Sequence, residues 1–177
     1  RPLAEAIVKG RERIVLVSGI GDPGFAADIV DQLAASCVRA GLGVATIDAA
    51  SGRPSANPGL GDLLVGAASY GDVVHTDQAG QMARVPWGRQ DRLDTHSSHA
   101  VTLAEALSDI YHVVLIAAGA PGAAADLRAF AGTDGYLVIA STLSVDEESA
   151  ADLEADVAAL GFTRLQVVGV DDDAQVA

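Results

Sequence analysis

The sequence predicts an α/β fold, in which a mainly parallel sheet carries helices on both faces. Short apolar runs rich in β-branched residues alternate with longer segments whose apolar residues recur at helical spacing. The run at residues 14–17 is continuously apolar, which is typical of a strand covered on both faces of a parallel sheet. Of the 177 residues, 50% are hydrophobic, which is enough to bury a sizeable core. We expect one domain spanning residues 1–177, with an N-terminal segment at residues 1–12 and a frayed tail at residues 171–177.

Helices and strands are expected to alternate along the chain. Apolar residues at helical spacing predict a helix over residues 25–39, with Gly41 at its C′ position. The strand expected at residues 43–48 ends in Asp48, and the loop after it is rich in Gly, Pro, Ser and Asn. The other expected elements are a helix at residues 2–10, helical pieces at 62–66 and 71–74, a strand at 81–85, a helix at 99–108, a strand at 112–118, a helix at 123–130, a strand at 136–140, a helix at 145–160 and a strand at 165–170.

Composition and charge exclude several function classes. The formal net charge of −13 argues against nucleic acid or an anionic membrane as a direct partner through a broad face. The only cysteine, Cys37, lies among apolar residues of a predicted helix, so we expect a buried structural thiol and a reducing compartment. No uncharged apolar run approaches the roughly 18 residues that span a bilayer, and no signal peptide is visible. The chain begins with Arg1 rather than methionine, and we expect it to be a piece of a longer protein.

A glycine-rich turn follows the first strand and has the backbone features of a phosphate-binding loop. Gly19, Gly21 and Gly24 permit positive φ and close backbone approach. Asp22 and Pro23 fit the N-cap and the first position of the next helix. A strand that turns on glycines into a helix N-terminus often holds phosphate.

The charged groups of a nucleotide-binding P-loop are missing from this turn. In the motif GxxxxGK[ST], backbone amides cradle the phosphates, a lysine reaches the β and γ groups, and a hydroxyl binds magnesium. Gly19 and Gly24 have the spacing of the two glycines, but Phe25 and Ala26 stand in place of the lysine and the hydroxyl. The chain's only lysine, Lys9, precedes the strand. We therefore expect Phe25 to pack partly inward and no anion to occupy the turn.

The same glycines also fit GxGxxG, the dinucleotide-binding fingerprint. In that interpretation Gly19, Gly21 and Gly24 receive a pyrophosphate, Asp48 binds the ribose, and the chain is a Rossmann-type oxidoreductase. Asp22 would crowd the pyrophosphate, and no Tyr and Lys or Cys and His pair is available for redox chemistry. Strand order discriminates the two interpretations, because a Rossmann enzyme crosses over between its first and fourth strands, whereas a P-loop ATPase relative places another strand beside the first.

Several segments taken together resemble a known family. They are IDAASGRP at residues 47–54, GLGDLLVGAASYGDVV at residues 59–74, RVPWGR at residues 84–89 and YHVVLIAAGAP at residues 111–121. Their order and spacing resemble the cytoplasmic nucleotide-binding domain of exopolysaccharide chain-length proteins. These are the polysaccharide co-polymerases and their bacterial tyrosine kinases, which are relatives of the MinD and ParA ATPases. The resemblance covers residues 13–170 and implies a P-loop NTPase-like three-layer sandwich.

Carried over residue by residue, the resemblance implies that the catalytic groups are lost. In the family's second Walker motif, IDAD followed by RRP, Asp48 and Arg53 match, whereas Ala50 has lost the second acid. In the Walker B strand, Ala117 replaces the aspartate that organises magnesium and water. The tyrosines that receive phosphate in the kinase branch lie in the tail, and this tail has none. The chain's tyrosines are Tyr70, Tyr111 and Tyr136, all inside the predicted domain.

The resemblance therefore predicts a pseudo-ATPase or pseudokinase domain on the cytoplasmic side of the inner membrane. We expect it to act in regulation or assembly of polysaccharide polymerisation and export, with no cofactor and with MgATP binding absent or weak. Its expected partners are proteins of the export complex, with a homo-oligomer left open, and its membrane contact is expected through segments outside this chain. The alternative is an active ATPase or tyrosine kinase in which Arg11, Arg13, Arg53 or an arginine of a neighbouring subunit replaces the lysine, although nothing replaces the acid at Ala117.

The other polar candidates have structural interpretations beside functional ones. Asp48 is as well suited to capping the next turn as to binding a ligand. We expect no metal site, because the histidines lack ligand spacing and suit solvated loops; they are His75, His96, His99 and His112. The acids at residues 146–148 are expected in the first turn of a helix, where they interact favourably with the positive end of the helix dipole. Arg53 and Trp87 are the candidate residues for a protein contact surface, and the alternative for Trp87 is a place in the core.

Overall fold

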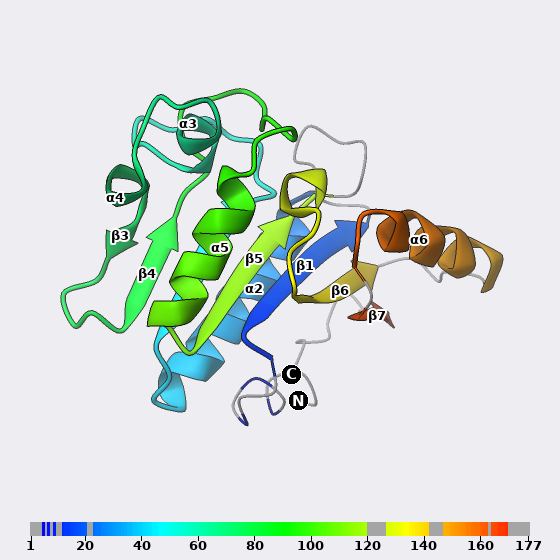
Figure 1. The fold of residues 1–177 in the computed structure, drawn as a ribbon. Coiled ribbons are helices and arrows are strands. Elements are labelled where there is room, and N and C mark those ends of the chain that lie inside the picture. Colours follow the sequence, from blue (N-terminus) through cyan, green and yellow to red (C-terminus); the bar gives the residue numbers. More distant parts are fainter. Residues whose placement is uncertain are drawn as a thin grey trace.

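A computed structural model describes residues 5, 7, 9, 12–20, 23–119, 127–141, 147–162 and 164–169. Within these residues a twisted sheet lies between helices on its two faces (Figure 1). The elements are β1 (Ile14–Ile20), α2 (Pro23–Arg39), β2 (Val44–Ala49), α3 (Leu60–Leu64), α4 (Tyr70–Val73), β3 (His75–Thr76), β4 (Met82–Val85), α5 (His99–Ile110), β5 (Val113–Ala118), the 3-10 helix η1 (Leu127–Phe130), β6 (Tyr136–Ser141), α6 (Glu147–Ala159) and β7 (Arg164–Gly169).

The strand order rejects the Rossmann interpretation. The seven strands run in the order β3-β4-β2-β5-β1-β6-β7, and every pairing is parallel except that of β3 with β4. Strand β5 therefore separates β1 from β2, whereas a Rossmann sheet places its first two strands side by side. The α/β fold with a mainly parallel sheet and helices on both faces is confirmed, and the dinucleotide-binding alternative is wrong.

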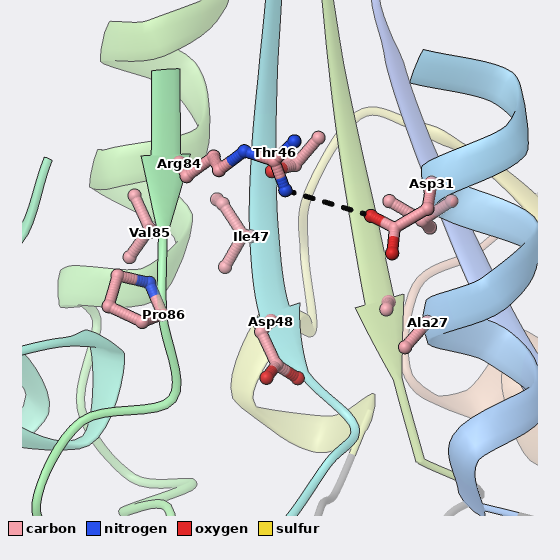
Figure 2. A pocket seen from close by; sticks show the side chains of 10 residues that line it. Ala27, Asp31, Thr46, Ile47, Asp48, Arg84, Val85 and Pro86 are labelled. Atoms are coloured by element: carbon pink, nitrogen blue, oxygen red, sulfur yellow. Dashed lines mark ion pairs between the residues drawn. The ribbon is translucent and has the colours of Figure 1, made fainter. Parts of the chain in front are cut away.

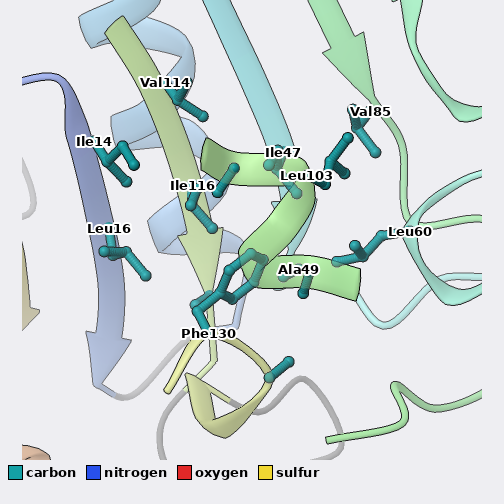
Figure 3. Packing of buried hydrophobic residues seen from close by; sticks show 14 of the residues in the cluster. Ile14, Leu16, Ile47, Ala49, Leu60, Val85, Leu103, Val114, Ile116 and Phe130 are labelled. Atoms are coloured by element: carbon teal, nitrogen blue, oxygen red, sulfur yellow. The ribbon is translucent and has the colours of Figure 1, made fainter. Parts of the chain in front are cut away.

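Alternation of side chains along the central strands builds a separate core on each face of the sheet. On one face, Val17 and Leu115 are buried beneath α2. On the other, Leu16 packs in a larger cluster with Leu103 of α5 and Phe130 of η1 (Figure 3). Because both faces are covered, β1 and β5 consist almost entirely of apolar residues, as the sequence suggested.

The helix that follows β1 ends as its sequence predicts. Gly41 has φ of +84°, and its amide donates to Val38 O at 2.9 Å. The amide of Leu42 donates to Cys37 O at 3.0 Å, which completes a Schellman motif with Gly41 at C′. Cys37 itself is fully buried, and this burial raises the pKa of its thiol. The prediction of a buried structural cysteine is confirmed.

Some expected elements differ in length or type. Strand β1 continues three residues beyond residue 17, because its backbone pairs with β6 as far as Ile20 and Ser141. Of the helix expected at residues 123–130, the described part is the 3-10 helix η1, and residues 123–126 lie outside the described residues. Strand β3 was not expected, since its two residues are exposed and carry no apolar pattern.

Other expectations fall wholly or partly on residues that are not described. Of the helix expected at residues 2–10, only residues 5 and 7 are described as helical. Residues 142–146, at the start of the last expected helix, and the tail lie outside the described residues. Among the described helices, none is both long and apolar enough to cross a membrane.

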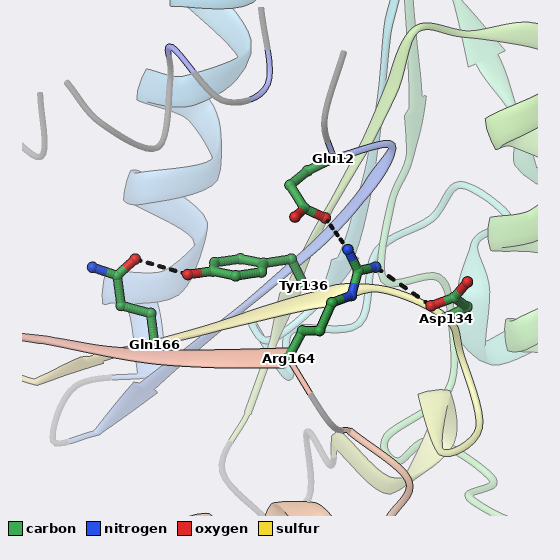
Figure 4. A network of polar contacts seen from close by, with 5 residues as sticks. All are labelled: Glu12, Asp134, Tyr136, Arg164 and Gln166. Atoms are coloured by element: carbon green, nitrogen blue, oxygen red, sulfur yellow. Dashed lines mark hydrogen bonds and ion pairs between the residues drawn. The ribbon is translucent and has the colours of Figure 1, made fainter. Parts of the chain in front are cut away.

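Polar side chains tie the β6–β7 edge of the sheet to the segment before β1. Arg164 pairs through Nη1 with Glu12 Oε2 at 2.8 Å and through Nη2 with Asp134 Oδ1 at 3.4 Å (Figure 4). Beside them, the Tyr136 hydroxyl donates to Gln166 Oε1 at 2.9 Å. The Glu12 side chain is only 14% exposed, so its pair with Arg164 is screened less than an ordinary surface pair.

Candidate functional site

The parallel strands β1, β2, β4 and β5 all point toward one edge of the sheet, called here the carboxyl edge (Figure 1). Open α/β sheets bind their ligands at this edge. The predicted phosphate turn belongs to it, because Gly19 lies near the end of β1 and Gly24 lies in the first turn of α2. Gly21 and Asp22, the predicted N-cap, lie outside the described residues.

Phe25 and Ala26, which the motif comparison aligns with the lysine and the hydroxyl of a P-loop, are apolar and pack in or against the core. Ala26 is 1% exposed and belongs to the core beneath α2, together with Ile29 and Leu33 of the same helix face. Phe25 is partly buried and packs against that core. The expectation that Phe25 packs partly inward is confirmed, and the expectation that the turn holds no anion stays a prediction.

Asp48 and Ala117 lie directly opposite each other on neighbouring strands, as partners in the register of β2 and β5. Oδ1 of Asp48 accepts hydrogen bonds from the amides of Ala50 at 3.1 Å and Ser51 at 2.9 Å. Asp48 therefore caps the turn after β2, which is the structural role that the sequence allowed beside ligand binding. Its second oxygen, Oδ2, has no hydrogen bond within the described part of the chain, and the facing side chain is the methyl group of Ala117.

A groove of 260 Å³ opens between α2 and the strands β2 and β4 (Figure 2). One wall is formed by Ala27, Val30 and Asp31 of α2. The floor includes Thr46 and Asp48 of β2 with Ala117 of β5, and the far wall includes Arg84 and Pro86. Sequence reasoning missed this groove, although the alternation of Val44, Thr46 and Asp48 places two polar side chains on a sheet face that is otherwise apolar.

A buried carboxylate joins two loops at the carboxyl edge. Asp62 is 3% exposed. Its Oδ2 accepts from the amides of Gly59 at 2.9 Å and Arg89 at 3.0 Å, and its Oδ1 accepts from Gln90 Nε2 at 3.1 Å. Burial favours the neutral acid, but these hydrogen bonds and the charge of Arg89 outweigh it and lower the pKa of Asp62.

Close backbone contact accompanies this carboxylate. A Cβ atom at Gly59 would overlap the carbonyl oxygen of Pro86, so only glycine fits there. The amides of Leu60 and Gly61 donate to Pro86 O at 2.8 Å and Trp87 O at 2.9 Å. The start of α3 is therefore fixed against the loop that follows β4.

The two candidate contact residues have different environments. Trp87 is 1% exposed, packs in the core beneath α5, and donates from Nε1 to Gln90 O at 2.7 Å. Its proposed place on a contact surface is wrong, because an indole with its N–H satisfied internally is buried here at little polar cost. Arg53 is exposed in the loop after β2, and its role in a contact stays a prediction.

The arginines considered as replacements for the lysine do not all reach the turn. Arg13 precedes β1 and donates from Nη2 to Ser108 O at 2.6 Å, so it lies at the opposite edge of the sheet. A seven-residue strand separates it from the turn, which is about 20 Å at ~3.3 Å per residue. This position rules Arg13 out as a substitute, and Arg11 lies outside the described residues.

Three of the four exposed histidines contact backbone groups. His75 Nε2 lies 3.2 Å from Pro58 O, His99 Nδ1 lies 3.2 Å from Leu63 O, and His112 Nδ1 accepts from the Gly43 amide at 2.8 Å. His75 lies in β3 and His99 begins α5, so the expectation of loop positions is wrong for these two. Within the described ranges, no group of three or more metal-ligating side chains is present. Of the acids at residues 146–148, residues 147 and 148 begin α6, and residue 146 is not described.

Comparison with known proteins places this geometry in a recognised fold. No model of a known protein family matches the chain, and no curated protein matches it. Among solved structures, the BceF tyrosine kinase domain is similar with a TM-score of 0.70 and 21% identity, covering 95% of this chain and 75% of that one. The kinase domain of the Escherichia coli tyrosine kinase ETK has a TM-score of 0.71 and 17% identity, covering 99% and 74%. The cell division ATPase MinD of Pyrococcus furiosus has a TM-score of 0.61 and 18% identity, covering 90% and 71%.

These likenesses establish the fold. The chain has an α/β fold similar to that of these P-loop NTPase-like neighbours, the tyrosine kinase domains of BceF and ETK and the ATPase MinD.

Proposed function

We propose that this chain is a non-catalytic, tyrosine-kinase-like domain that acts in the regulation or assembly of exopolysaccharide polymerisation and export. The supporting observation is that three positions expected to bind phosphate and magnesium carry apolar side chains. Where the resemblance places a lysine, a hydroxyl and a Walker B aspartate, the chain has Phe25, Ala26 and Ala117. Ala26 and Ala117 are buried, and Phe25 packs against the same core.

Phosphoryl transfer requires groups that this arrangement does not supply. The transferred phosphoryl group needs positive charge beside it, and the magnesium ion needs carboxylate oxygens. Asp48 is the one retained acid of the Walker positions, and its Oδ1 is already engaged by the amides of Ala50 and Ser51. A degenerate phosphate loop that binds MgATP weakly or not at all is the consequence of these losses.

The link to polysaccharide export rests on two independent likenesses. The fold is similar to the BceF and ETK tyrosine kinase domains, and the segments around Asp48, Arg53 and residues 59–74 resemble the chain-length proteins. On this proposal the domain lies on the cytoplasmic side of the inner membrane. It contributes a constitutive contact with proteins of the export complex or with further copies of itself.

Arg53 is the residue through which this contact is tested. Replacing Arg53 with glutamate in the full-length protein is expected to change polymer length and to reduce recovery of the export complex severalfold, because exposed arginines often carry interface energy. Arg39→Glu is the matched control, since Arg39 is exposed at the end of α2, at the opposite edge of the sheet. Unchanged polymer length and complex recovery in a folded Arg53→Glu protein would refute the contact.

A further inference from the structure

The floor of the groove between α2 and β4 carries a hydroxyl group that makes no hydrogen bond to the described part of the chain. Thr46 is 7% exposed, lies on the floor of the groove, and has no hydrogen bond for its hydroxyl within the described part of the chain. Among the described residues, Thr133 Oγ1 is a fully buried side-chain oxygen without a partner and Thr46 Oγ1 is not, so the oxygen of Thr46 can be reached from the groove. The hydroxyl of Thr46 is therefore available to a ligand in the groove.

Asp48 supplies the second polar group, on the same side of β2. Residues two apart in a strand face the same way, and Figure 2 shows both side chains on the side of β2 that faces α2. Because the turn uses only Oδ1 of Asp48, Oδ2 remains an open acceptor. Thr46 and Asp48 thus offer a neutral and a charged oxygen along one floor.

The charge of Asp48 is not compensated inside the groove. Arg84 stands opposite Thr46 in the register of β2 and β4, two positions from Asp48, and pairs with Asp31, Nη1 to Oδ1 at 4.0 Å. That pair is mutually neutralising, and both side chains are more than half exposed. No cationic side chain lies within ion-pair distance of Asp48 among the described residues. An anionic ligand would meet an unpaired carboxylate here, whereas a cation would neutralise it.

The remaining lining is apolar and suits a hydrocarbon stem. Ala27 and Val30 of α2 face Pro86 across the groove, and Ala117 completes the floor beside Asp48. A ligand with a charged head and an alkyl stem would place its head on the oxygens and its stem on these side chains.

From these observations we infer that the groove binds an alkylammonium or alkylguanidinium group, with its N–H donors directed to Asp48 Oδ2 and Thr46 Oγ1. The group can belong to a free small amine or to a lysine or arginine side chain of a peptide. Both sources share the chemistry, and they are distinguished by the probes used.

The test is a titration of the 15N-labelled chain followed by NMR. The probes are agmatine, n-butylamine, the neutral n-butanol and a capped Gly-Arg-Gly peptide. Agmatine or the peptide is expected to shift the amide signals of residues 46–48 and 117, and n-butanol is not. Tighter binding of agmatine identifies a free amine as the source, and tighter binding of the peptide identifies a protein side chain.

Three variants separate the groove from the general negative charge of the protein. Asp48→Asn keeps an oxygen for the turn and should weaken agmatine binding by about tenfold or more, because a charge-assisted bond is lost. Thr46→Val, which removes only the hydroxyl, should weaken it severalfold. Asp28→Asn is the control, because Asp28 is an exposed acid of α2 outside the groove, and it should leave binding unchanged.

Several results would overturn the inference. They are no shift with millimolar agmatine and peptide, equal shifts with n-butanol, or equal weakening by Asp28→Asn. Full reversal of the agmatine shifts by an equal concentration of MgCl2 would also overturn it, since the groove would then prefer a metal ion. Thr46→Val keeps the inference testable should Asp48→Asn fail to fold.

Discussion

Replacing Trp87 with alanine is expected to lower the free energy of unfolding by about 3–5 kcal/mol, the usual range for removing a large buried aromatic side chain. Trp87 is among the largest fully buried side chains of the described residues, and it belongs to the core cluster that also contains residues of α3 and α5. The substitution also leaves the Gln90 carbonyl without its Nε1 donor. Urea unfolding of the purified chain measures the loss.

Arg53→Ala is the control variant whose stability is compared with that of Trp87→Ala. Arg53 is exposed and makes no side-chain hydrogen bond or ion pair within the described residues, so its replacement should change the stability by less than about 0.5 kcal/mol. Had Trp87 been a surface contact residue, the two variants would be equally stable. Near-equal urea midpoints would therefore contradict the core position of Trp87.

Replacing Asp62 with alanine is expected to be the second most damaging change, at roughly 2–4 kcal/mol, because hydrogen bonds to a buried charge are strong and their donors remain behind. Three donors from Gly59, Arg89 and Gln90 lose their acceptor at once. Asp72 provides a matched control, since it accepts from Ser69 N at 2.9 Å and Ser69 Oγ at 2.7 Å in a similar capping arrangement but is exposed. Asp72→Ala should lower the free energy of unfolding by clearly less than Asp62→Ala does.

The contribution of Asp62 to the free energy of unfolding is expected to depend on pH. Because the pKa of Asp62 is lowered in the folded chain, its contribution is fully present above its unfolded pKa, near 3.9. The contribution is lost as the pH falls from there through the folded pKa. The stability difference between the wild-type chain and Asp62→Ala should therefore be constant from pH 7 to pH 5 and shrink below about pH 4. A difference that grows on acidification would contradict the lowered pKa.

The layered fold was predictable because the apolar residues of both cores recur at strand or helix spacing within short segments of the sequence. The apolar runs that became β1 and β5 indicate strands buried on two faces, and the helical spacing from Ile29 to Cys37 indicates the helix above them. Gly41 marked the end of that helix, and its positive φ follows from the Schellman motif. Each of these signals depends only on residues close together in the sequence.

Features of the candidate site depend instead on contacts between distant segments. The Asp62 carboxylate meets Arg89 and Gln90, 27 and 28 positions away, and nothing local distinguishes it from an exposed helix-capping acid. Trp87 was equally suited by its type to an interface and to a core. The groove is lined by residues of α2, β2, β4 and β5, which are distant in the sequence and meet only in the folded chain.

The measurement that tests the central claim most directly is isothermal titration calorimetry of the chain with MgATP, beside the ETK kinase domain as a positive control. On our proposal, Phe25, Ala26 and Ala117 replace the groups that hold phosphate and magnesium, and we therefore predict no binding heat at millimolar MgATP. We also predict no phosphotyrosine after incubation of the chain with MgATP. Micromolar binding of MgATP, or phosphorylation of any tyrosine by the isolated chain, would contradict the account and support an active enzyme with displaced catalytic residues.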